Sequence, residues 1–305
     1  MSAKVVGIGA NVFDTLITVP YFPKEDTKLR AESVKECGGG PCATGLVAAA
    51  KLGASAAYIG ALAKDSGGEF LRADMERFGV DTAHTDSVAG ASSFSSVVLL
   101  SKQDATRTCV FHKGNLPSFR MDEDKCAAVR DAEILMVDGN ELEQAIEAAK
   151  LAKNSGTKVL YDAGGRYEGI ERLLPLADIL IPSEEFALGV TGTRTAADAA
   201  KALYDTYHPE IVVVTQGKAG GTAYDGETVW EYPAFPVDTV DSNGAGDVFH
   251  GAYAYALTEG FDYRHACVFA SAVSALKCTR LGARDGVPTR AETEKFIKER
   301  LGHEL

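Results

Sequence analysis

The segment Asp241–Asp247 (DSNGAGD) carries the residue types that phosphoryl transfer requires. Its glycines Gly244 and Gly246 allow a tight turn and leave backbone N–H groups uncovered by side chains. Because an apolar helical pattern follows over Val248–Leu257, those N–H groups lie at a helix N-terminus, where the helix dipole favours phosphate. A carboxylate is unfavourable beside phosphate, so we interpret Asp247 as a general base that takes a proton from an attacking hydroxyl group. The alternative is an ordinary first-turn aspartate that only complements the helix dipole.

A second glycine-rich segment, Gly38–Thr44 (GGGPCAT), leads into another helical pattern. Three consecutive glycines let a ligand approach the backbone closely, and Pro41 suits the first turn of a helix. Taken alone, the segment equally fits a helix start of unusual flexibility. It is therefore a candidate binding loop whose role depends on the rest of the chain.

Composition and motif spacing argue against several other classes of function. The chain has 305 residues and a formal net charge of −12, which makes it a poor candidate for binding nucleic acid or an anionic membrane surface. Its six cysteines lack C-x-x-C spacing and its six histidines lack ligand spacing. Val12 stands where a dinucleotide-binding G-x-G-x-x-G loop needs its third glycine, which disfavours an NAD-dependent oxidoreductase. With no signal-peptide or membrane-spanning pattern, we expect a cytoplasmic protein with reduced thiols.

Strand and helix patterns alternate along most of the chain. Short apolar or β-branched runs predict strands over Val5–Ile8, Ala56–Ile59, Ile134–Val137, Val159–Tyr161, Ile179–Ile181 and Ile211–Thr215. Helical spacing predicts helices over Ala43–Leu52, Glu69–Phe78, Leu142–Ala152, Ala196–Tyr207 and Arg290–Leu301, the last with Thr289 as N-cap. This alternation predicts an α/β fold with a mostly parallel sheet and helices on both faces.

Two regions break the alternation, residues 12–35 and 92–112. Runs over 93–100 and 106–111 predict a hairpin around Gln103-Asp104, and Leu16–Val19 could pair with Leu29–Val34 in the same way. Together these segments predict a small sheet that stands apart from the main one and covers a substrate site as a lid. Its open edges favour pairing with a second subunit, so we expect a homodimer formed through the lid.

The order of these motifs resembles the ribokinase-like (PfkB) carbohydrate kinases over nearly the whole chain. The N-terminal signature of that family is similar to Gly38–Thr44 followed by Lys51–Ala54, Ala63–Gly68 and Phe78–Val80. Val213–Gly220 resembles the strand and loop of its nucleotide site, and Val240–Asp247 resembles its C-terminal signature, D-T-x-G-A-G-D. The resemblance implies a single kinase domain over residues 1–305, built as a three-layer α/β/α sandwich with a β lid. It also implies transfer of the γ-phosphate of ATP to a hydroxymethyl group of a small carbohydrate.

The resemblance implies a role for each matching residue. Asp247 would be the catalytic base, with an anion hole formed by Gly244, Ala245 and Gly246. The residues expected to bind substrate are Asp14, Asn11, Gly39, Gly40 and Thr44, and those expected to bind the nucleotide are Thr215, Gly217, Gly220, Ser242 and Ser271. Mg²⁺ would accompany ATP, and a monovalent cation such as K⁺ would lie between Asp241 and the Gly282 loop.

Several positions depart from the family pattern, among them Ser242, which replaces a Thr and keeps the hydroxyl group. Thr44 stands where many sugar kinases have a substrate-binding Asn, which affects the expected sugar contacts. Ser183 and Phe186 replace the Asn and Glu of the family segment P-N-x-x-E. The usual magnesium or phosphate role of that segment therefore does not carry over intact, and Glu184 is the residue that could replace it in part.

The substrate is the least specified part of the prediction. The segments Asp247–Ala252 and Ala275–Arg280 resemble bacterial ketose kinases, including sulfofructose kinases. A sulfonate calls for a basic residue at the position of Asn140, and the lid residue Arg107 is either a substrate contact or a solvated charge. We therefore expect a neutral ketose or aldose, with a nucleoside as second choice. Outside the kinases, the alternative is a non-catalytic sugar- or nucleotide-binding sensor, against which the intact Asp247 argues.

Overall fold

The computed structural model describes residues 2–104, 106–303 and 305, so that Ala105 within the predicted lid region lies outside the described residues. The main sheet has nine strands in the order β15-β14-β13-β12-β11-β10-β1-β4-β6. In chain order the strands are β1 (Val5–Ile8), β4 (Ala56–Tyr58), β6 (Val80–Asp81), β10 (Ile134–Val137), β11 (Lys158–Ala163), β12 (Ile179–Pro182), β13 (Ile211–Thr215), β14 (Gly221–Tyr224) and β15 (Val229–Tyr232). All pairs from β6 to β13 are parallel, and β14 and β15 extend the sheet antiparallel. The mostly parallel sheet and its six predicted strands are confirmed.

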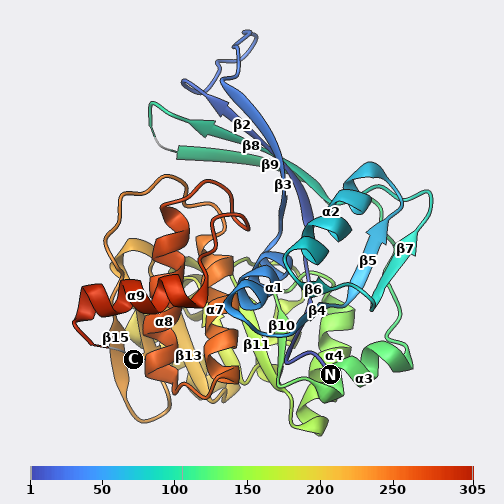
Figure 1. Ribbon diagram of the computed structural model, residues 1–305. Helices are drawn as coiled ribbons and strands as arrows, with labels where there is room; N and C mark the ends of the chain where they lie inside the picture. Colours follow the sequence, from blue (N-terminus) through green and yellow to red (C-terminus); the bar gives the residue numbers. More distant parts are fainter. Residues whose placement is uncertain (1, 105, 304) are drawn as a thin grey trace.

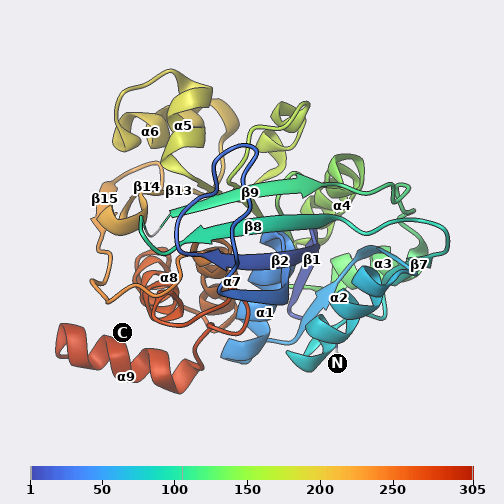
Figure 2. The same cartoon turned by 90° about the horizontal axis from the view of Figure 1, so that it is seen from above.

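Helices cover both faces of this sheet. The helices are α1 (Pro41–Leu52), α2 (Ser66–Arg77), α3 (Glu123–Asp131), α4 (Leu142–Ser155), α5 (Glu184–Thr191), α6 (Ala196–Tyr207), α7 (Ala245–Thr258), α8 (Tyr263–Cys278) and α9 (Arg290–Leu301). Seen from above, α5 and α6 lie on one side of the strands and α8 and α9 on the other (Figure 2). One hydrophobic cluster packs α1, α7 and α8 on the sheet, and a second packs α3 to α6 on its opposite face. The three-layer α/β/α sandwich is therefore confirmed.

The predicted helices are present, with small changes at their ends. The first begins at Pro41, two residues before its predicted start, because proline fits the first turn. The last has the predicted bounds, and Thr289 forms a reciprocal capping box with Glu292. Short 3₁₀ turns occupy Ile170–Arg172, Leu174–Leu176 and Gly217–Ala219. None of the described helices is long and apolar enough to cross a membrane.

A second sheet stands apart from the main one. Its order is β3-β2-β8-β9, formed by β2 (Val12–Val19), β3 (Ser33–Gly39), β8 (Ser95–Ser101) and β9 (Thr106–His112). Figure 1 shows it projecting from the sandwich, and Figure 2 shows its strands over the region of α1 and α7. We call this four-stranded sheet the lid. The predicted hairpin between β8 and β9 is confirmed as an antiparallel pair.

The predicted partner of the first lid strand was correct in part. Ile17 pairs with Val34 and Thr18 with Ser33, but the partner strand runs over Ser33–Gly39 and not Leu29–Val34, and its antiparallel register places Gly39 opposite Val12. The segment that follows Pro20 is mostly exposed and charged, so it cannot supply the apolar face of a strand. Pairing instead continues into the glycine run that the sequence had suggested to be a loop. A further two-stranded parallel sheet joins β5 (Gly60–Ala63) to β7 (Thr85–Val88).

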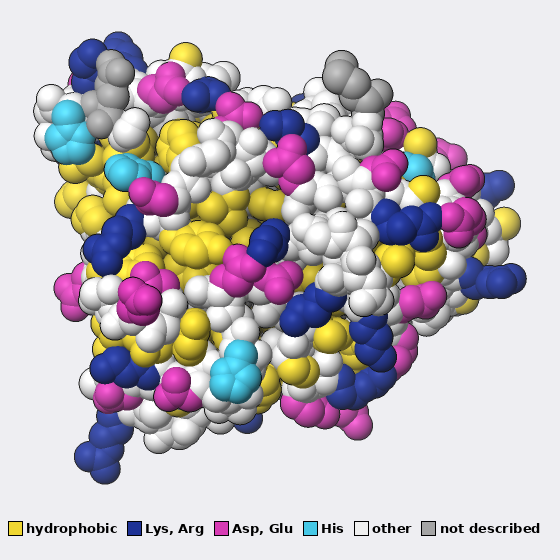
Figure 3. All heavy atoms as spheres, turned by 90° about the horizontal axis from the view of Figure 1, so that it is seen from below, with side chains coloured by type: hydrophobic (Ala, Val, Ile, Leu, Met, Phe, Trp, Pro, Cys, Tyr) yellow, Lys and Arg dark blue, Asp and Glu magenta, His cyan; other side chains and the backbone are white. Residues whose placement is uncertain are grey.

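The face opposite the lid carries both charged and hydrophobic side chains. Side chains of Lys and Arg are interspersed there with those of Asp and Glu, and hydrophobic side chains are exposed between them (Figure 3). Charges of both signs are therefore mixed on this face, despite the net charge of −12 for the whole chain.

Two glycines allow α7 to lie directly against α1. A Cβ atom added to Gly251 of α7 would lie 1.9 Å from the carbonyl oxygen of Gly45 in α1. Backbone atoms cannot move aside as a flexible side chain can, so this contact requires glycine at 251. The close approach holds the first turn of α7 at a defined place beside the sheet.

This packing predicts opposite effects for one substitution at two positions of α7. Gly251→Ala should lower the free energy of unfolding by about 1–3 kcal/mol or more, because the added methyl group overlaps the α1 backbone. Gly246→Ala places its methyl group in open space and should leave the stability unchanged or raise it by up to ~1 kcal/mol. Urea unfolding of the two variants and the wild type measures both values. Equal stability of the two variants would contradict the proposed contact.

Candidate active site

The first turn of α7 presents backbone N–H groups as the sequence predicts. Gly244 is the N-cap residue, with φ 72° in the left-handed region that glycine adopts without strain. No described side chain caps this helix. The Ala245 N–H group donates to the Ser242 carbonyl oxygen at 3.3 Å, whereas those of Gly244 and Gly246 have no acceptor among the described residues and are left for another group, at the positive end of the helix dipole.

Two cavities are lined by neighbouring residues around the start of α7. The larger has a volume of about 530 Å³, and Ser242, Ala245 and Gly246 belong to its wall. The smaller has a volume of about 260 Å³ and lies under the lid, with Asn243 in its wall. Residues 242–246 therefore stand between the two cavities, and a group bound at the N-terminus of α7 can be reached from both.

All five residues predicted to bind a nucleotide line the larger cavity. They are Thr215, Gly217, Gly220, Ser242 and Ser271. Apolar side chains complete the wall, among them Phe235, Val237, Phe249, Ala275 and Cys278. An apolar wall together with a few polar groups is typical of a pocket for a flat heterocycle that carries a polar extension.

The residues predicted to bind a substrate separate into two groups. Asp14, Gly40 and Arg107 line the smaller cavity. Its remaining wall includes Ser96, Lys113, Asn140 and Tyr167, together with the aromatic rings of Phe94 and Phe111. Asp14 is buried and accepts a 2.6 Å hydrogen bond from the Ser96 hydroxyl group, and burial raises the pKa of its carboxyl group.

Three predicted substrate residues do not line this cavity. The Asn11 side-chain oxygen accepts a hydrogen bond from buried Arg284, whose guanidinium also donates to the Gly39 carbonyl and pairs with Asp74. Thr44 is fully buried in α1, and its hydroxyl group has no partner among the described residues. The structure therefore places all three residues outside the lining of the smaller cavity: Asn11, Gly39 and Thr44.

Asp247 lies in the first turn of α7, in a group of carboxylates, and lines neither of the two cavities. Desolvation by the surrounding protein raises its pKa to about 7, and the nearby charge of Asp162 adds to this effect. Asp162 is the penultimate residue of β11, and Asp138 follows β10, whose carboxyl end adjoins that of β11. Neither aspartate was predicted as a site residue from the sequence. The signal was present, because each aspartate follows a buried apolar run at the carboxyl end of a parallel strand, where ligand sites of α/β folds gather.

His250 connects this turn to the sheet. Its Nδ1 atom is 2.7 Å from the Gly246 carbonyl oxygen and 3.2 Å from the Asp162 carboxylate. Its Nε2 atom is 3.0 Å from the carbonyl oxygen of Ile181 in β12. The side chain is buried, so His250 links α7 to two strands and is itself shielded from ligands.

The residues predicted near metal ions lie in two places. Asp241 and Gly282 come together, because the Gly282 N–H group donates to the Asp241 carboxylate at 2.8 Å. Glu184 lines neither cavity and accepts a 2.7 Å hydrogen bond from the Gln216 side chain. Within the described residues, no group of three or more His, Cys, Asp or Glu side chains is arranged to hold a metal ion.

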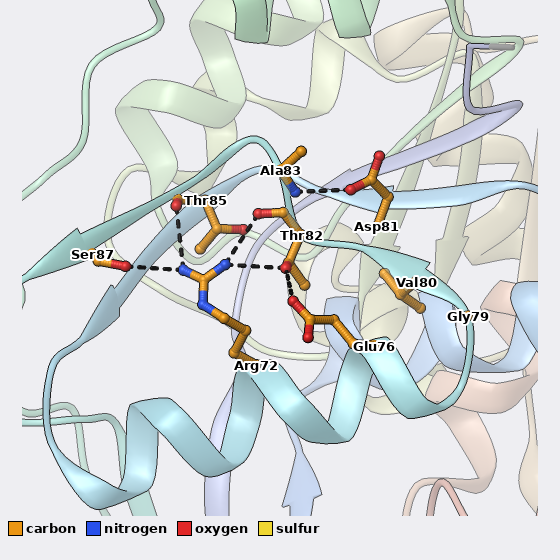
Figure 4. A pocket seen from close by; sticks show the side chains of 9 residues that line it. All are labelled: Arg72, Glu76, Gly79, Val80, Asp81, Thr82, Ala83, Thr85 and Ser87. Carbon is orange, nitrogen blue, oxygen red and sulfur yellow. Dashed lines mark hydrogen bonds between the residues drawn. The ribbon is translucent and has the colours of Figure 1, made fainter.

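A third hollow lies between α2 and the β6–β7 region (Figure 4). Arg72 occupies it and donates hydrogen bonds to the Thr82 hydroxyl, the Thr85 carbonyl and the Ser87 hydroxyl. Glu76 accepts a hydrogen bond from Thr82. The charged side chains of this hollow are therefore engaged in holding the loop after α2, and it shares no lining residue with the two cavities.

Comparison with known proteins gives one consistent family. The family model described as pfkB family carbohydrate kinase matches residues 2–290. A ribokinase of Haemophilus influenzae is 28% identical over 98% of this chain and 99% of its own length. A crystal structure from Agrobacterium tumefaciens is 30% identical, covers 100% of both chains and has a TM-score of 0.93. The structure of Arabidopsis thaliana ribokinase complexed with ribose and ATP is 27% identical, covers 98% of this chain and 99% of its own, and has a TM-score of 0.87.

The raised pKa of Asp247 predicts a pH-dependent effect on stability. Between the ordinary value of 3.8 and about 7, the folded protein holds a proton on this group that the unfolded chain has lost, so the stability that the group contributes falls as pH rises. Asp247→Asn removes this loss. Relative to the wild type, the variant should gain roughly 1–3 kcal/mol in free energy of unfolding between pH 5 and pH 8.

Urea unfolding at pH 5 and pH 8 measures this gain. Asp122→Asn is the control, because hydrogen bonds from Lys125 lower the pKa of the exposed Asp122 carboxyl, so both its folded and unfolded values lie below pH 5. The stability difference for that variant should be the same at both pH values. A difference for Asp247→Asn that is also independent of pH would show that its carboxyl group is not perturbed.

Proposed function

The chain belongs to the pfkB family of carbohydrate kinases, and we propose that it transfers the γ-phosphate of ATP to a hydroxymethyl group of a small ketose or aldose. The observation that carries this proposal is the position of residues 242–246 between the two cavities. Phosphoryl transfer requires the donor and the acceptor to meet at a site that stabilises the charge on the moving group. A donor bound in one cavity and an acceptor bound in the other would come together at the N-terminus of α7.

The larger cavity is the proposed ATP site. Its apolar wall suits the adenine ring, and Ala245 and Gly246 in the same wall belong to the helix N-terminus that the phosphates would reach. The related Arabidopsis ribokinase was crystallised with ribose and ATP, which supports the same pair of ligands here. Mg²⁺ enters as part of the MgATP substrate, since this ion is usually bound through phosphates and one or two carboxylates.

The smaller cavity is the proposed sugar site. Asp14, oriented by Ser96, would accept hydrogen bonds from sugar hydroxyl groups, and Asn140 can both donate and accept them. Phe94 and Phe111 supply apolar surface from the lid. Arg107 also lines this cavity and is a candidate sugar contact. This mixture favours a neutral sugar, because the carboxylate of Asp14 faces the same space as the cationic groups.

Asp247 is the proposed general base. Its pKa of about 7 leaves the carboxylate ionised in a large share of molecules at neutral pH, while its basicity is higher than that of an ordinary aspartate. It would accept the proton of the attacking hydroxyl group as the oxygen bonds to the γ-phosphorus in line with the leaving ADP. The N–H groups of Gly244, Ala245 and Gly246 would hold the negative charge that spreads over the transferred group.

An activity screen with one variant tests this function. Coupled detection of ADP against ketoses, aldoses, sugar acids, sulfosugars and nucleosides should identify a neutral sugar as the best substrate. Asp247→Asn should then lower kcat on that sugar by about 10²–10⁴-fold, because it removes a positioned base. ATP binding measured by calorimetry should be retained.

The outcomes of the screen separate the alternatives. Preference for a nucleoside would make the chain a nucleoside kinase, and absence of ADP formation with all acceptors would favour a binding protein. Near-normal turnover by Asp247→Asn would reject the assignment of the base.

The lid also supports a proposal about assembly. Val97 and Val110 stand opposite each other on β8 and β9 and are 42% and 69% exposed, and Val34 on β3 is 62% exposed. Exposed apolar side chains on an open sheet mark an interaction surface. We propose that two lids pair in a homodimer, which would cover these side chains.

Analytical ultracentrifugation tests this assembly. The wild type should sediment as a dimer, and the double variant Val97→Glu/Val110→Glu as a monomer, because paired lids would bury the added charges. Leu301→Glu, at an exposed position of α9 away from the lid, is the matched control and should remain dimeric. A monomeric wild type, or a double variant that stays dimeric, would contradict pairing through the lid.

A further inference from the structure

A fully buried lysine lies beneath the segment between the two cavities. Lys277 belongs to α8, and its side chain has no exposure to solvent. Its ammonium group donates hydrogen bonds to the backbone carbonyl of Asp241, at 2.7 Å, and to that of Asn243. The Asp241 carboxylate lies 3.8 Å from the same nitrogen. A lysine is rarely buried completely unless it is paired, and here its partners are the backbone and the carboxylate of the phosphate-binding segment.

This lysine occupies the place expected for a monovalent cation. The family resemblance implies a K⁺ site between Asp241 and the Gly282 loop, where carboxylate and carbonyl oxygens would be the ligands. One carboxylate oxygen of Asp241 accepts a hydrogen bond from the N–H group of Asn243, and the other accepts one from the N–H group of Gly282. The carbonyl oxygens of residues 241 and 243 accept hydrogen bonds from the ammonium group of Lys277. The oxygens therefore already have donors, and one positive charge already lies among them, so the residues present do not fit K⁺.

We infer that the ammonium group of Lys277 is a built-in replacement for the monovalent cation and makes this kinase independent of K⁺. The replacement conserves the charge at the site, since a lysine ammonium and K⁺ each carry one positive charge. Unlike K⁺, the ammonium group is covalently attached to the protein. It therefore holds residues 241–243 in place at any ionic composition of the medium. Lys277 touches neither cavity and thus acts as a positioning residue.

The peptide geometry explains how this contact affects the site. In a trans peptide the C=O and N–H bonds point in opposite directions, and no described peptide bond is cis. Because the Asn243 carbonyl points at Lys277, the N–H group of Gly244 points away from it. The hydrogen bond from Lys277 to the Asn243 carbonyl therefore fixes the direction of the Gly244 N–H group, which belongs to the proposed anion hole. Burial lowers the pKa of Lys277, whereas the nearby Asp241 carboxylate favours its charged form.

Substitution of Lys277 should create a requirement for K⁺. The protein is assayed in KCl and in choline chloride of equal ionic strength, in sodium-free buffer. The wild type should show the same kcat and the same melting temperature in both salts. Lys277→Ala leaves room beside the two carbonyls and should lose roughly 10²-fold in kcat in choline chloride, the scale of losing one oxyanion-hole donor. KCl should restore most of this loss and raise the melting temperature of this variant only.

Two further variants separate the charge from other effects. Lys277→Met fills the same space with a neutral side chain, so KCl should not restore its activity. Lys51→Met is the matched control, since Lys51 also donates to backbone carbonyls, those of Arg284 and Asp285, in the neighbouring loop. It should behave like the wild type in both salts.

Several results would overturn the inference. They are a wild type activated by K⁺ over choline, a Lys277→Ala variant that keeps full activity in choline, and a folded Lys277→Ala variant that KCl does not restore. If that variant fails to fold, the comparison of the wild type in the two salts still decides. The inference rests on the proposed kinase function only for its activity readout. A wild type that phosphorylates no acceptor would defeat that function, while a K⁺-specific rise in the wild-type melting temperature would defeat the inference alone.

Discussion

The proposed chemistry depends on one backbone turn, in which Gly244 adopts a left-handed conformation and starts α7 between two cavities. Three contacts hold this turn from different sides. Gly251 lies against the α1 backbone, His250 reaches the carbonyl of Ile181 in the sheet, and Lys277 binds the carbonyls that precede Gly244. Each contact removes a way in which the first-turn N–H groups could move. A preorganised anion site needs this rigidity, because its donors must already point at the charge when it develops.

The electrostatics of the site follow from the same arrangement. Burial raises the pKa of Asp247, and the like charges of Asp162 and Asp138, which also lie where parallel strands and a helix start converge, raise it further. This proximity costs stability in the free protein, as expected where a functional carboxyl group is kept more basic than usual. The N-terminus of α7 and the buried Lys277 supply positive potential nearby. The overall acidity of the chain therefore does not describe the local field at the turn.

Much of the fold could be predicted because buried strands and amphipathic helices leave periodic patterns. The run Ile134–Val137 and the cap at Thr289 are local signals, and both were correct. Eight of the residues predicted for ligand binding line one of the two cavities: Asp14, Gly40, Arg107, Thr215, Gly217, Gly220, Ser242 and Ser271. The errors concern the side to which a residue points. Thr44 lies beside a binding motif yet faces the core, and the role of Lys277 depends on two carbonyls more than thirty residues away in sequence, which no local pattern reveals.

A crystal structure with ADP, aluminium fluoride and the sugar that is turned over tests the central claim most directly. We predict ADP in the larger cavity, the fluoride complex against the N–H groups of residues 244–246, and a sugar oxygen between it and the Asp247 carboxylate. Binding of the nucleotide outside the larger cavity, or an Asp247 side chain turned away from both ligands, would contradict the account.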